Sequence, residues 1–192
     1  MKSLLAIILA FSLVSLVSCA SGARVQMPTE LAAPQIPTIV VNAQAFEASY
    51  RPSVYLTAVK DIRTSPFLIK YDNRNGESFT GDLGLNVQYA FRKALRSIGF
   101  SVVDKASVAL SPKIERWVAT KKENEITCEA ALALDLLGPD GTAINTSHYE
   151  SFDRLHKDAA EDEILLGLGQ VMSEVIKQAV EDKEIMELIK AY

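Results

Sequence analysis

Residues 125–152 read EITCEAALALDLLGPDGTAINTSHYESF and give the clearest indication of the fold class. Its first half alternates with a period of two, which is typical of a β-strand with one buried face. The pattern places Cys128 on that buried face. Gly138-Pro139-Asp140-Gly141 is a turn sequence, and residues 142–152 return as a more polar strand, so we predict a hairpin. The residues on the buried face are Ile126, Cys128, Ala130, Leu132, Leu134 and Leu136.

After the hairpin, the pattern changes to helical spacing. Asp158 and Glu161 have the spacing of a capping box, so we expect the helix to begin near Asp158. A stripe of that spacing runs along one face and predicts packing on the core. Residues 182–192 repeat the pattern with Ile185, Leu188 and Ile189. A coiled-coil partner surface is the alternative for the stripe, but two heptads are too few. Its members are Ile164, Leu165, Leu168, Val171, Met172, Val175, Ile176 and Ala179.

An earlier helix is predicted over residues 82–98. Asp82 is suited to the N-cap, and Gly99 stands where a left-handed residue ends a helix. Apolar residues recur at helical spacing between them. They are Leu83, Val87, Ala90, Phe91, Ala94, Leu95 and Ile98.

Shorter strands are expected on both sides of this helix, over residues 54–59, 67–69, 100–103 and 108–114. Pro112 suggests an edge strand or a bulge, because proline has no N–H to donate to a ladder. Residues 72–82, DNRNGESFTGD, are predicted as a polar loop.

This order of elements predicts the α+β class. A hairpin-rich antiparallel sheet needs only one covered face, and two amphipathic helices can cover it. We therefore expect a two-layer sandwich formed by a single domain over residues 51–192.

The first twenty residues, MKSLLAIILAFSLVSLVSCA, are predicted to direct export. Lys2 is followed by an apolar stretch that is too short to span a bilayer, which favours a secretory signal. The Leu16-Val17-Ser18-Cys19 sequence resembles the bacterial lipobox. That resemblance implies cleavage between Ser18 and Cys19 and diacylation of the Cys19 thiol. The alternative is a free cysteine beside an ordinary cleavage site.

Residues 19–50 are predicted to be a lipidated, flexible tether that follows the signal peptide, residues 1–18. Pro28, Pro34 and Pro37 interrupt helical structure and favour an extended spacer. An ordered edge strand at residues 39–41 is equally compatible with the sequence. Ala20 follows the cysteine where an Asp would resemble an inner-membrane retention signal. We therefore expect the protein to be anchored by Cys19 in the outer membrane, facing the periplasm.

Several segments together resemble the YajG family of bacterial lipoproteins. The resemblance implies an envelope lipoprotein without a catalytic motif, whose role is not defined. The order of elements also looks like that of lipoproteins that assist lipid transport across the envelope. The segments are residues 16–19, 61–63, 87–102, 108–117, 125–137 and 181–190.

Composition narrows the possible partners. The net charge of −4 disfavours nucleic acid, because neutralising phosphates requires an excess of Lys and Arg. Cys19 and Cys128 are the only two cysteines, so acylation of Cys19 leaves no pair for an internal disulfide. We expect Cys128 to be a small buried hydrophobe.

No catalytic set is recognisable in the sequence. His148 and His156 are the only histidines, and a structural or solvent-exposed role is expected for both. Residues 76–84 contain glycines but no phosphate-loop spacing, and no metal-ligand spacing occurs. We therefore predict a protein that is not an enzyme and has no cofactor. An unrecognised hydrolase would require one histidine to meet a serine and a carboxylate.

One group of side chains could serve binding. Arg92, Lys93 and Arg96 crowd the last turns of the first helix. They could contact anionic lipid headgroups, or they could complement the helix dipole in water. The leading interpretation is a membrane-anchored, non-catalytic binding or scaffolding module of the envelope, with a protein or lipid partner. The alternative is an accessory lipoprotein of a lipid or small-molecule transport system, which predicts an apolar pocket between sheet and helices.

Overall fold

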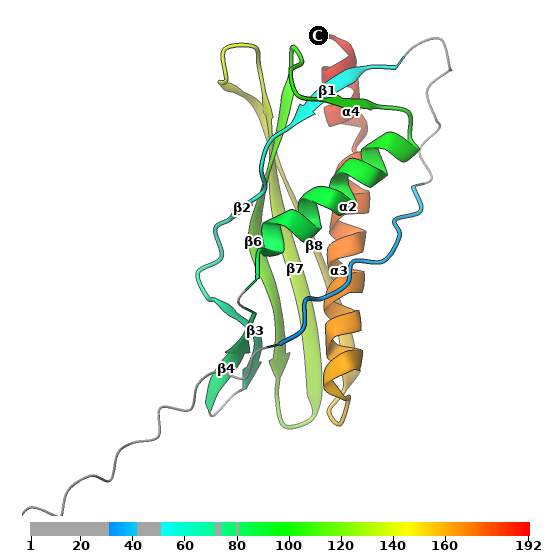
Figure 1. The fold of residues 1–192 in the computed structure, drawn as a ribbon. Coiled ribbons are helices and arrows are strands. Elements are labelled where there is room, and N and C mark those ends of the chain that lie inside the picture. The colour runs from blue at the N-terminus through cyan, green and yellow to red at the C-terminus, as the bar shows by residue number, and fades with distance from the viewer. Residues whose placement is uncertain (1–30, 42–50, 72–73, 80) are drawn as a thin grey trace, which may run out of the picture.

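A computed structural model describes residues 31–41, 51–71, 74–79 and 81–192 (Figure 1). The predicted signal peptide and the Ser18-Cys19 processing site lie outside these residues. The described part contains three helices, α2 (Leu83–Ser97), α3 (Glu161–Glu181) and α4 (Lys183–Lys190). Its strands are β1 (Ser53–Leu56), β2 (Lys60–Asp61), β3 (Phe67–Tyr71), β4 (Arg74–Ser78), β5 (Ser101–Val103), β6 (Ala109–Lys121), β7 (Glu125–Leu137) and β8 (Ala143–His156).

The strands form one eight-stranded sheet around the long strand β6. On one side of β6, the strands β7 and β8 are antiparallel, as the hairpin predicts. On the other side, β1, β2 and β3 follow one another along β6, and all three are parallel to it. The α+β class is confirmed, but the sheet is mixed rather than wholly antiparallel. The reason is that α2 lies in the chain between β1, β2 and β3 on one side and β6 on the other. A crossover through a helix lets the chain return in the same direction, so the strands it joins are parallel.

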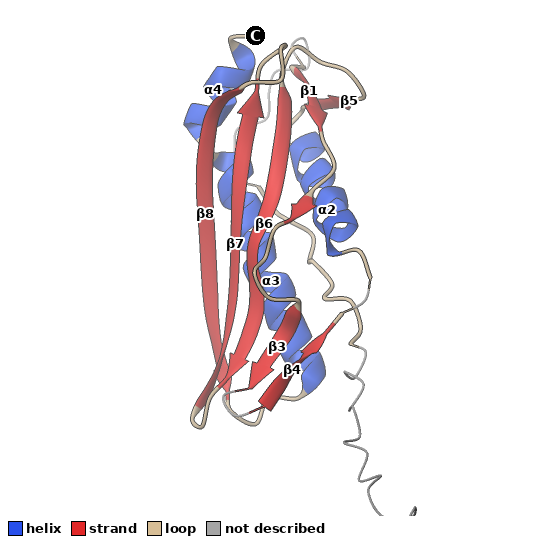
Figure 2. Cartoon of the chain, turned by 90° about the vertical axis from the view of Figure 1, so that its left-hand side faces the viewer, coloured by secondary structure: helices blue, strands red, loops and turns tan. Residues whose placement is uncertain are grey.

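The helices cover one face of the sheet (Figure 2). Helix α3 packs along β7 and β8, and α2 crosses α3 and covers the short strands. The stripe predicted on α3 is buried, apart from the partly buried Leu165. The Trp117 indole N–H reaches from β6 to the Leu168 carbonyl at 2.8 Å. The stripe is therefore part of the core, and the coiled-coil alternative is wrong.

Local signals at the ends of α2 and at the hairpin are confirmed. The Asp82 carboxylate accepts a hydrogen bond from the Leu85 N–H at 3.2 Å. Gly99 has a φ of 97°, the left-handed conformation expected after the helix. Gly141, in the β7–β8 turn, has a φ of 80°. Cys128 is fully buried, as the alternation predicts.

The predicted start of α3 is wrong. The helix begins at Glu161, with Ala160 as its N-cap. The Ala159 N–H donates to the His156 carbonyl at 3.0 Å, so a turn occupies the residues around Asp158. The Glu163 carboxylate accepts from the Ala160 N–H at 3.0 Å and supplies half of a capping box without a capping hydroxyl.

The loop predicted over residues 72–82 contains the strand β4. Among the described strands it pairs only with β3, with irregular register, and its Ser78 carbonyl accepts from Leu31, so it is an edge strand. Backbone hydrogen bonds can hold an edge strand that has no alternating apolar pattern. The polar sequence of β4 therefore did not indicate a strand.

Pro112 lies in a strand that is paired on both sides, so it does not mark an edge. The carbonyls of Leu110 and Ile114 accept from Thr57 and Ile62, so even-numbered residues of β6 direct their backbone groups toward β1 and β2. Pro112 falls between the segments of β6 that pair with β1 and β2. Its missing N–H therefore faces a gap between two short strands.

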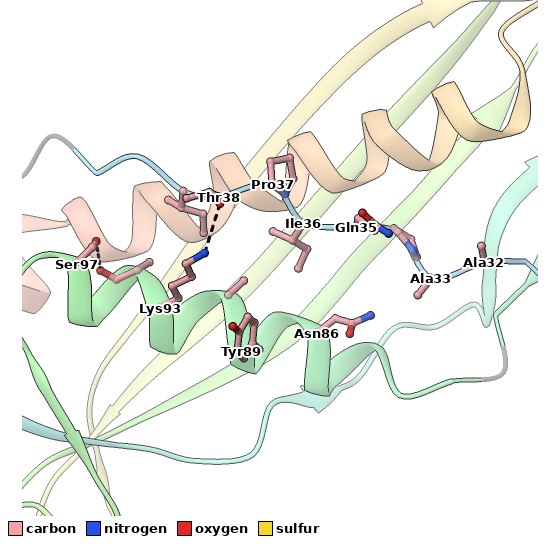
Figure 3. Close-up of a pocket in the computed structure, with 14 residues that line it drawn as sticks. Ala32, Ala33, Gln35, Ile36, Pro37, Thr38, Asn86, Tyr89, Lys93 and Ser97 are labelled. Atoms are coloured by element: carbon pink, nitrogen blue, oxygen red, sulfur yellow. Dashed lines mark hydrogen bonds between the residues drawn. The ribbon is translucent and has the colours of Figure 1, made fainter.

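Residues 31–41, which we call the strap, run in an extended conformation between α2 and α3 (Figures 1 and 3). The Leu31 N–H donates to the Ser78 carbonyl at 3.4 Å, and Leu31 and Ile39 are buried. A Cβ added to Gly169 of α3 would lie 2.0 Å from the Gln35 carbonyl oxygen, so the strap crosses α3 there. Residues 31–41 are therefore neither a free spacer nor an edge strand of the sheet; they are packed between two helices.

Candidate functional site

The outer surface of α2 combines exposed apolar side chains with two basic ones, the half-buried Arg92 and the exposed Arg96. Leu85 and Tyr89 are 61% and 71% exposed. Arg92 and Arg96 follow at the spacing that keeps residues on one helical face. The sequence of α2 contains no acidic residue. The helix therefore presents an apolar half followed by a cationic half, on a chain whose net charge is −4.

A groove lies beside this surface, between α2 and the strap (Figure 3). It has a volume of about 550 Å³, within the range of roughly 300–1,000 Å³ that is usual for small-molecule sites. The Lys93 ammonium, at its edge, donates to the Thr38 hydroxyl at 3.4 Å. The other side chains that form it are apolar or uncharged, among them Ile36, Tyr89 and Ser97.

The structure thus separates the three basic residues predicted from the sequence. Lys93 lines the groove, whereas Arg92 and Arg96 lie outside it; Tyr89 borders both the groove and the outer face. We call Leu85, Tyr89, Arg92 and Arg96 the α2 outer face. This surface is suited to binding. Its cations can attract anionic groups, and the adjacent apolar side chains can be buried against a partner or a membrane.

Sequence reasoning missed the apolar half of this surface. Leu85 and Tyr89 lie off the buried stripe of α2, one helical turn apart. Plotting the apolar residues that the stripe leaves over would have found them. The strap side of the groove could not be found in this way, because Ile36 and Thr38 precede α2 by about fifty residues in the sequence.

Neither cavity described here lies between the sheet and the helices. The first is the groove beside the strap, and the second, of about 340 Å³, borders Phe152 and Arg154 on strand β8. The side chains that α3 directs at β7 are fully buried in the core. The pocket between sheet and helices that a transport role predicts is therefore not among these cavities.

The histidines contact carboxylates in exposed positions. His148 Nδ1 lies 3.1 Å from Glu115 Oε2, and His156 Nδ1 lies 3.5 Å from Asp158 Oδ2. Their side chains are 64% and 77% exposed. Within the described residues, neither ring makes a hydrogen bond to a serine or threonine hydroxyl, so the nucleophile that a hydrolase requires does not join them.

The environment of Cys128 makes its thiol unreactive. Burial, and to a smaller extent the charge of Asp153, raises the pKa of the Cys128 thiol to about 12. Its Sγ lies 3.9 Å from the Ile164 carbonyl oxygen. The thiol is therefore protonated at neutral pH and acts as a small hydrophobe, as predicted.

The described residues contain neither a cluster of metal ligands nor a helix suited to span a bilayer. No group of three or more His, Cys, Asp or Glu side chains there could hold a metal ion. None of the three helices described has the length and apolar character that crossing a bilayer requires.

Comparison with solved structures shows the fold. Protein XCC0632 from Xanthomonas campestris matches with a TM-score of 0.59 at 13% identity, over 81% of this chain and 98% of that protein. The PelC dodecamer from Paraburkholderia phytofirmans gives a TM-score of 0.45 at 14% identity, over 68% and 86% of the two chains. A minor lipoprotein from Acinetobacter baumannii gives 0.39 at 11% identity, over 74% and 92%. Protein XCC0632 shares its fold with this chain. At 13% identity, the similarity shows the fold alone.

Comparison of sequences identifies the family. No curated protein matches the chain. The model of a family described as uncharacterized lipoprotein matches residues 37–190. The predicted lipoprotein character is thereby supported, whereas the YajG name itself is not confirmed. Because the match covers most of the sequence, this chain belongs to that family of uncharacterized lipoproteins.

Proposed function

We propose that this protein is an envelope lipoprotein whose domain is a non-catalytic binding module for anionic headgroups. The signal peptide, residues 1–18, is removed between Ser18 and Cys19, and acyl chains on Cys19 hold the protein at the membrane. Ala20 favours the outer membrane, with the domain facing the periplasm. The family match supports the lipoprotein character, and the α2 outer face supports the binding role.

The observation that carries the binding role is the pairing of exposed Leu85 and Tyr89 with Arg92 and Arg96 on one helical face. Helices that lie at a membrane surface combine apolar and aromatic residues with Lys and Arg. Each basic residue near an anionic surface contributes about 1 kcal/mol. Two long acyl chains provide durable anchoring, since each buried methylene contributes about 0.8 kcal/mol. The helix would then orient a domain that the lipid already retains.

The anchor is tested by replacing each cysteine in the full-length chain. We expect Cys19→Ser to abolish palmitate incorporation and to leave the unprocessed precursor, because the acylated thiol is lost. Cys128→Ser is the matched control and should keep both the label and the processing. A Cys19→Ser protein that is still labelled and processed would contradict the anchor.

Headgroup binding is tested with a chain that lacks residues 1–19, so that neither acyl chains nor the apolar signal peptide masks the contribution of α2. Binding to phosphatidylglycerol vesicles should weaken about 20- to 30-fold when Arg92 and Arg96 are both changed to Gln, from about 1 kcal/mol for each charge. Lys105→Gln with Lys157→Gln removes two exposed charges elsewhere and should have little effect. Flotation with the vesicles measures the bound fraction.

Three further arms complete this experiment. Phosphatidylcholine vesicles test whether the surface charge is needed, and free glycerol phosphate tests whether a soluble phosphate competes. Leu85→Ser with Tyr89→Ser tests the apolar half. Equal binding to neutral and anionic vesicles, or equal loss in the control pair, would contradict the proposed role of the arginines.

A second candidate, an accessory role in lipid or small-molecule transport, has the strap groove in its favour. Its volume of about 550 Å³ and single cationic side chain suit an anionic amphiphile. We expect native mass spectrometry of the membrane-extracted protein to detect a bound lipid if this role is correct. Ala90→Trp should remove it, because Ala90 lines the groove and a large side chain there would fill it. A protein that carries no lipid would favour the first candidate.

A further inference from the structure

Strand β8 is a long free edge of the sheet. It has 14 residues, and within the described part of the chain its only strand partner is β7. It contains neither proline nor lysine, two residues that proteins use to prevent edge strands from pairing. Figure 2 shows β8 at the left margin of the sheet, with α4 near its upper end only.

The even-numbered residues of β8 direct their backbone groups to this free edge. In the hairpin, the Gly138 N–H donates to the Thr142 carbonyl, and the register shift between Leu136 and Leu137 inserts one residue into β8. Beyond that shift, the odd-numbered residues bond to β7. The Gln178 side chain supports this assignment, since its amide donates to the Glu150 carbonyl from outside the sheet at 3.4 Å.

The side chains of the same residues lie on the face of the sheet opposite the helices. Phe152 is 68% exposed there and borders the hollow of about 340 Å³. Glu150 has no ion-pair partner among the described residues, and Arg154 has only a 3.9 Å contact with Glu125. An exposed aromatic ring thus stands between an acidic and a basic residue, each two positions away.

We propose that β8 pairs with β8 of a second copy of this chain, antiparallel, about a two-fold axis at Phe152. Phe152 then meets its own counterpart, and Glu150 faces Arg154 of the second copy on both sides of the axis. On the helix side, Tyr149 faces Leu155 of the second copy. The pairing of residues 150–154 alone would form about six backbone hydrogen bonds. The two sheets become one, with all helices on the same face.

Charge selects this register over its neighbours. A shift of the axis to Ser151 would set Glu150 opposite Phe152 and remove its pairing with Arg154, and a shift to Glu150 would place that carboxylate opposite itself. A shift in the other direction, to Asp153, would place two aspartates face to face on the helix side. Like charges directly opposite one another destabilise a pair of strands. Among these registers, only the axis at Phe152 sets the Glu150 carboxylate opposite the Arg154 guanidinium.

Space also favours the half of β8 around Phe152. Near the other end, Asn145 donates to Glu184 at 3.1 Å and Tyr149 donates to Asp182 at 2.7 Å, so α4 and its cap lie against that end. An axis at Phe152 pairs residues 148–156, so that of these two contacts only the one between Tyr149 and the α4 cap falls within the paired segment. The Gln178 contact is long for a hydrogen bond, and its loss is small beside the bonds gained.

The register is tested by cysteine cross-linking of the full-length chain in membranes. Phe152→Cys places a thiol opposite itself, with Cα atoms about 5.5 Å apart, a separation that a disulfide spans. His148→Cys is the matched control, because it lies on the same strand and face but its counterpart would be about 27 Å away. We expect a disulfide-linked dimer from Phe152→Cys alone. Equal yields from the two variants, or no dimer from either, would overturn the proposal.

Charge reversal tests the pairing of Glu150 with Arg154. In the Phe152→Cys background, Glu150→Arg or Arg154→Glu alone should slow cross-linking about tenfold, because two attractive pairs become repulsive. The two changes together restore opposite charges and should recover the rate. A double variant as slow as the single variants would overturn this register. The result does not depend on headgroup binding, since α2 lies on the other face of the sheet.

Discussion

At the scale of single residues, Cys128 shows how burial decides chemistry. The thiol is fully buried, and its pKa is raised to about 12. Alkylation requires the thiolate, so iodoacetamide should not label Cys128 in the native protein under mildly alkaline conditions. Denaturant should make it reactive, and intact mass measures the added group. Rapid labelling of the native protein would contradict the packing around α3.

Asp61 is an acidic residue whose titration is linked to folding. Arg63 donates to both of its carboxylate oxygens, at 2.9 and 2.8 Å, and also to the Trp117 carbonyl at 3.2 Å. Burial raises the pKa of Asp61, but the hydrogen bonds and charge of Arg63 outweigh that effect and hold the pKa below its usual value.

The lowered pKa of Asp61 determines how the free energy of unfolding changes with pH. The stabilisation by Asp61 is complete above the pKa of an unfolded Asp and is lost as the pH falls through the lower folded value. Asp61→Asn should reduce the free energy of unfolding at neutral pH by up to about 1 kcal/mol, since the pair is partly exposed. It should also flatten the acid limb of the stability profile. Urea unfolding at several pH values measures both, with exposed Asp104→Asn as the control.

At the scale of elements, the contact between α3 and the strap depends on a residue without a side chain. A Cβ at position 169 would lie 2.0 Å from the Gln35 carbonyl oxygen and 3.4 Å from Pro37. Gly169→Ala should therefore displace the strap, although alanine favours helix more than glycine does. We expect a loss of about 1–3 kcal/mol in the free energy of unfolding, as for other overpacked sites. The neighbouring, exposed Gln170→Ala should be nearly neutral or stabilising.

The elements also show what pattern can and cannot predict. Alternation over residues 126–136 and helical spacing in α2 and α3 were sufficient, because a buried face imposes its period on the sequence. The strand β4 and the start of α3 were not predicted, because backbone pairing and a turn determine them. The parallel pairing of β1, β2 and β3 with β6 depends on how the chain crosses over through α2, which periodicity does not encode.

The candidate site was predictable only in part for the same reason. Arg92, Lys93 and Arg96 are close in sequence, so their clustering on α2 was visible. Their division between the outer face and the groove depends on the strap, a remote segment that covers one side of the helix. The free edge of β8 likewise becomes evident only when the order of strands in the sheet is known.

At the scale of the whole molecule, we expect the strap to unfold together with the rest of the domain. Leu31 is 2% exposed in the core, whereas Val40 is 73% exposed. Leu31→Ala should lower the free energy of unfolding by about 2–3 kcal/mol, and Val40→Ala should have little effect. The Trp117 fluorescence and far-ultraviolet circular dichroism transitions should shift together. A Leu31→Ala protein as stable as the wild type would show that the strap is not part of the folded unit.

The position of the strap has a mechanical consequence. The described strap begins at Leu31, which is hydrogen-bonded to β4, and then runs between two helices. Tension applied from its amino-terminal side therefore first meets the Leu31–Ser78 hydrogen bond to the edge strand β4, and then the contacts of the strap with α2 and α3. Under an applied force, we expect these contacts to break before the long central strands separate. The strap would then detach first and leave the central sheet folded.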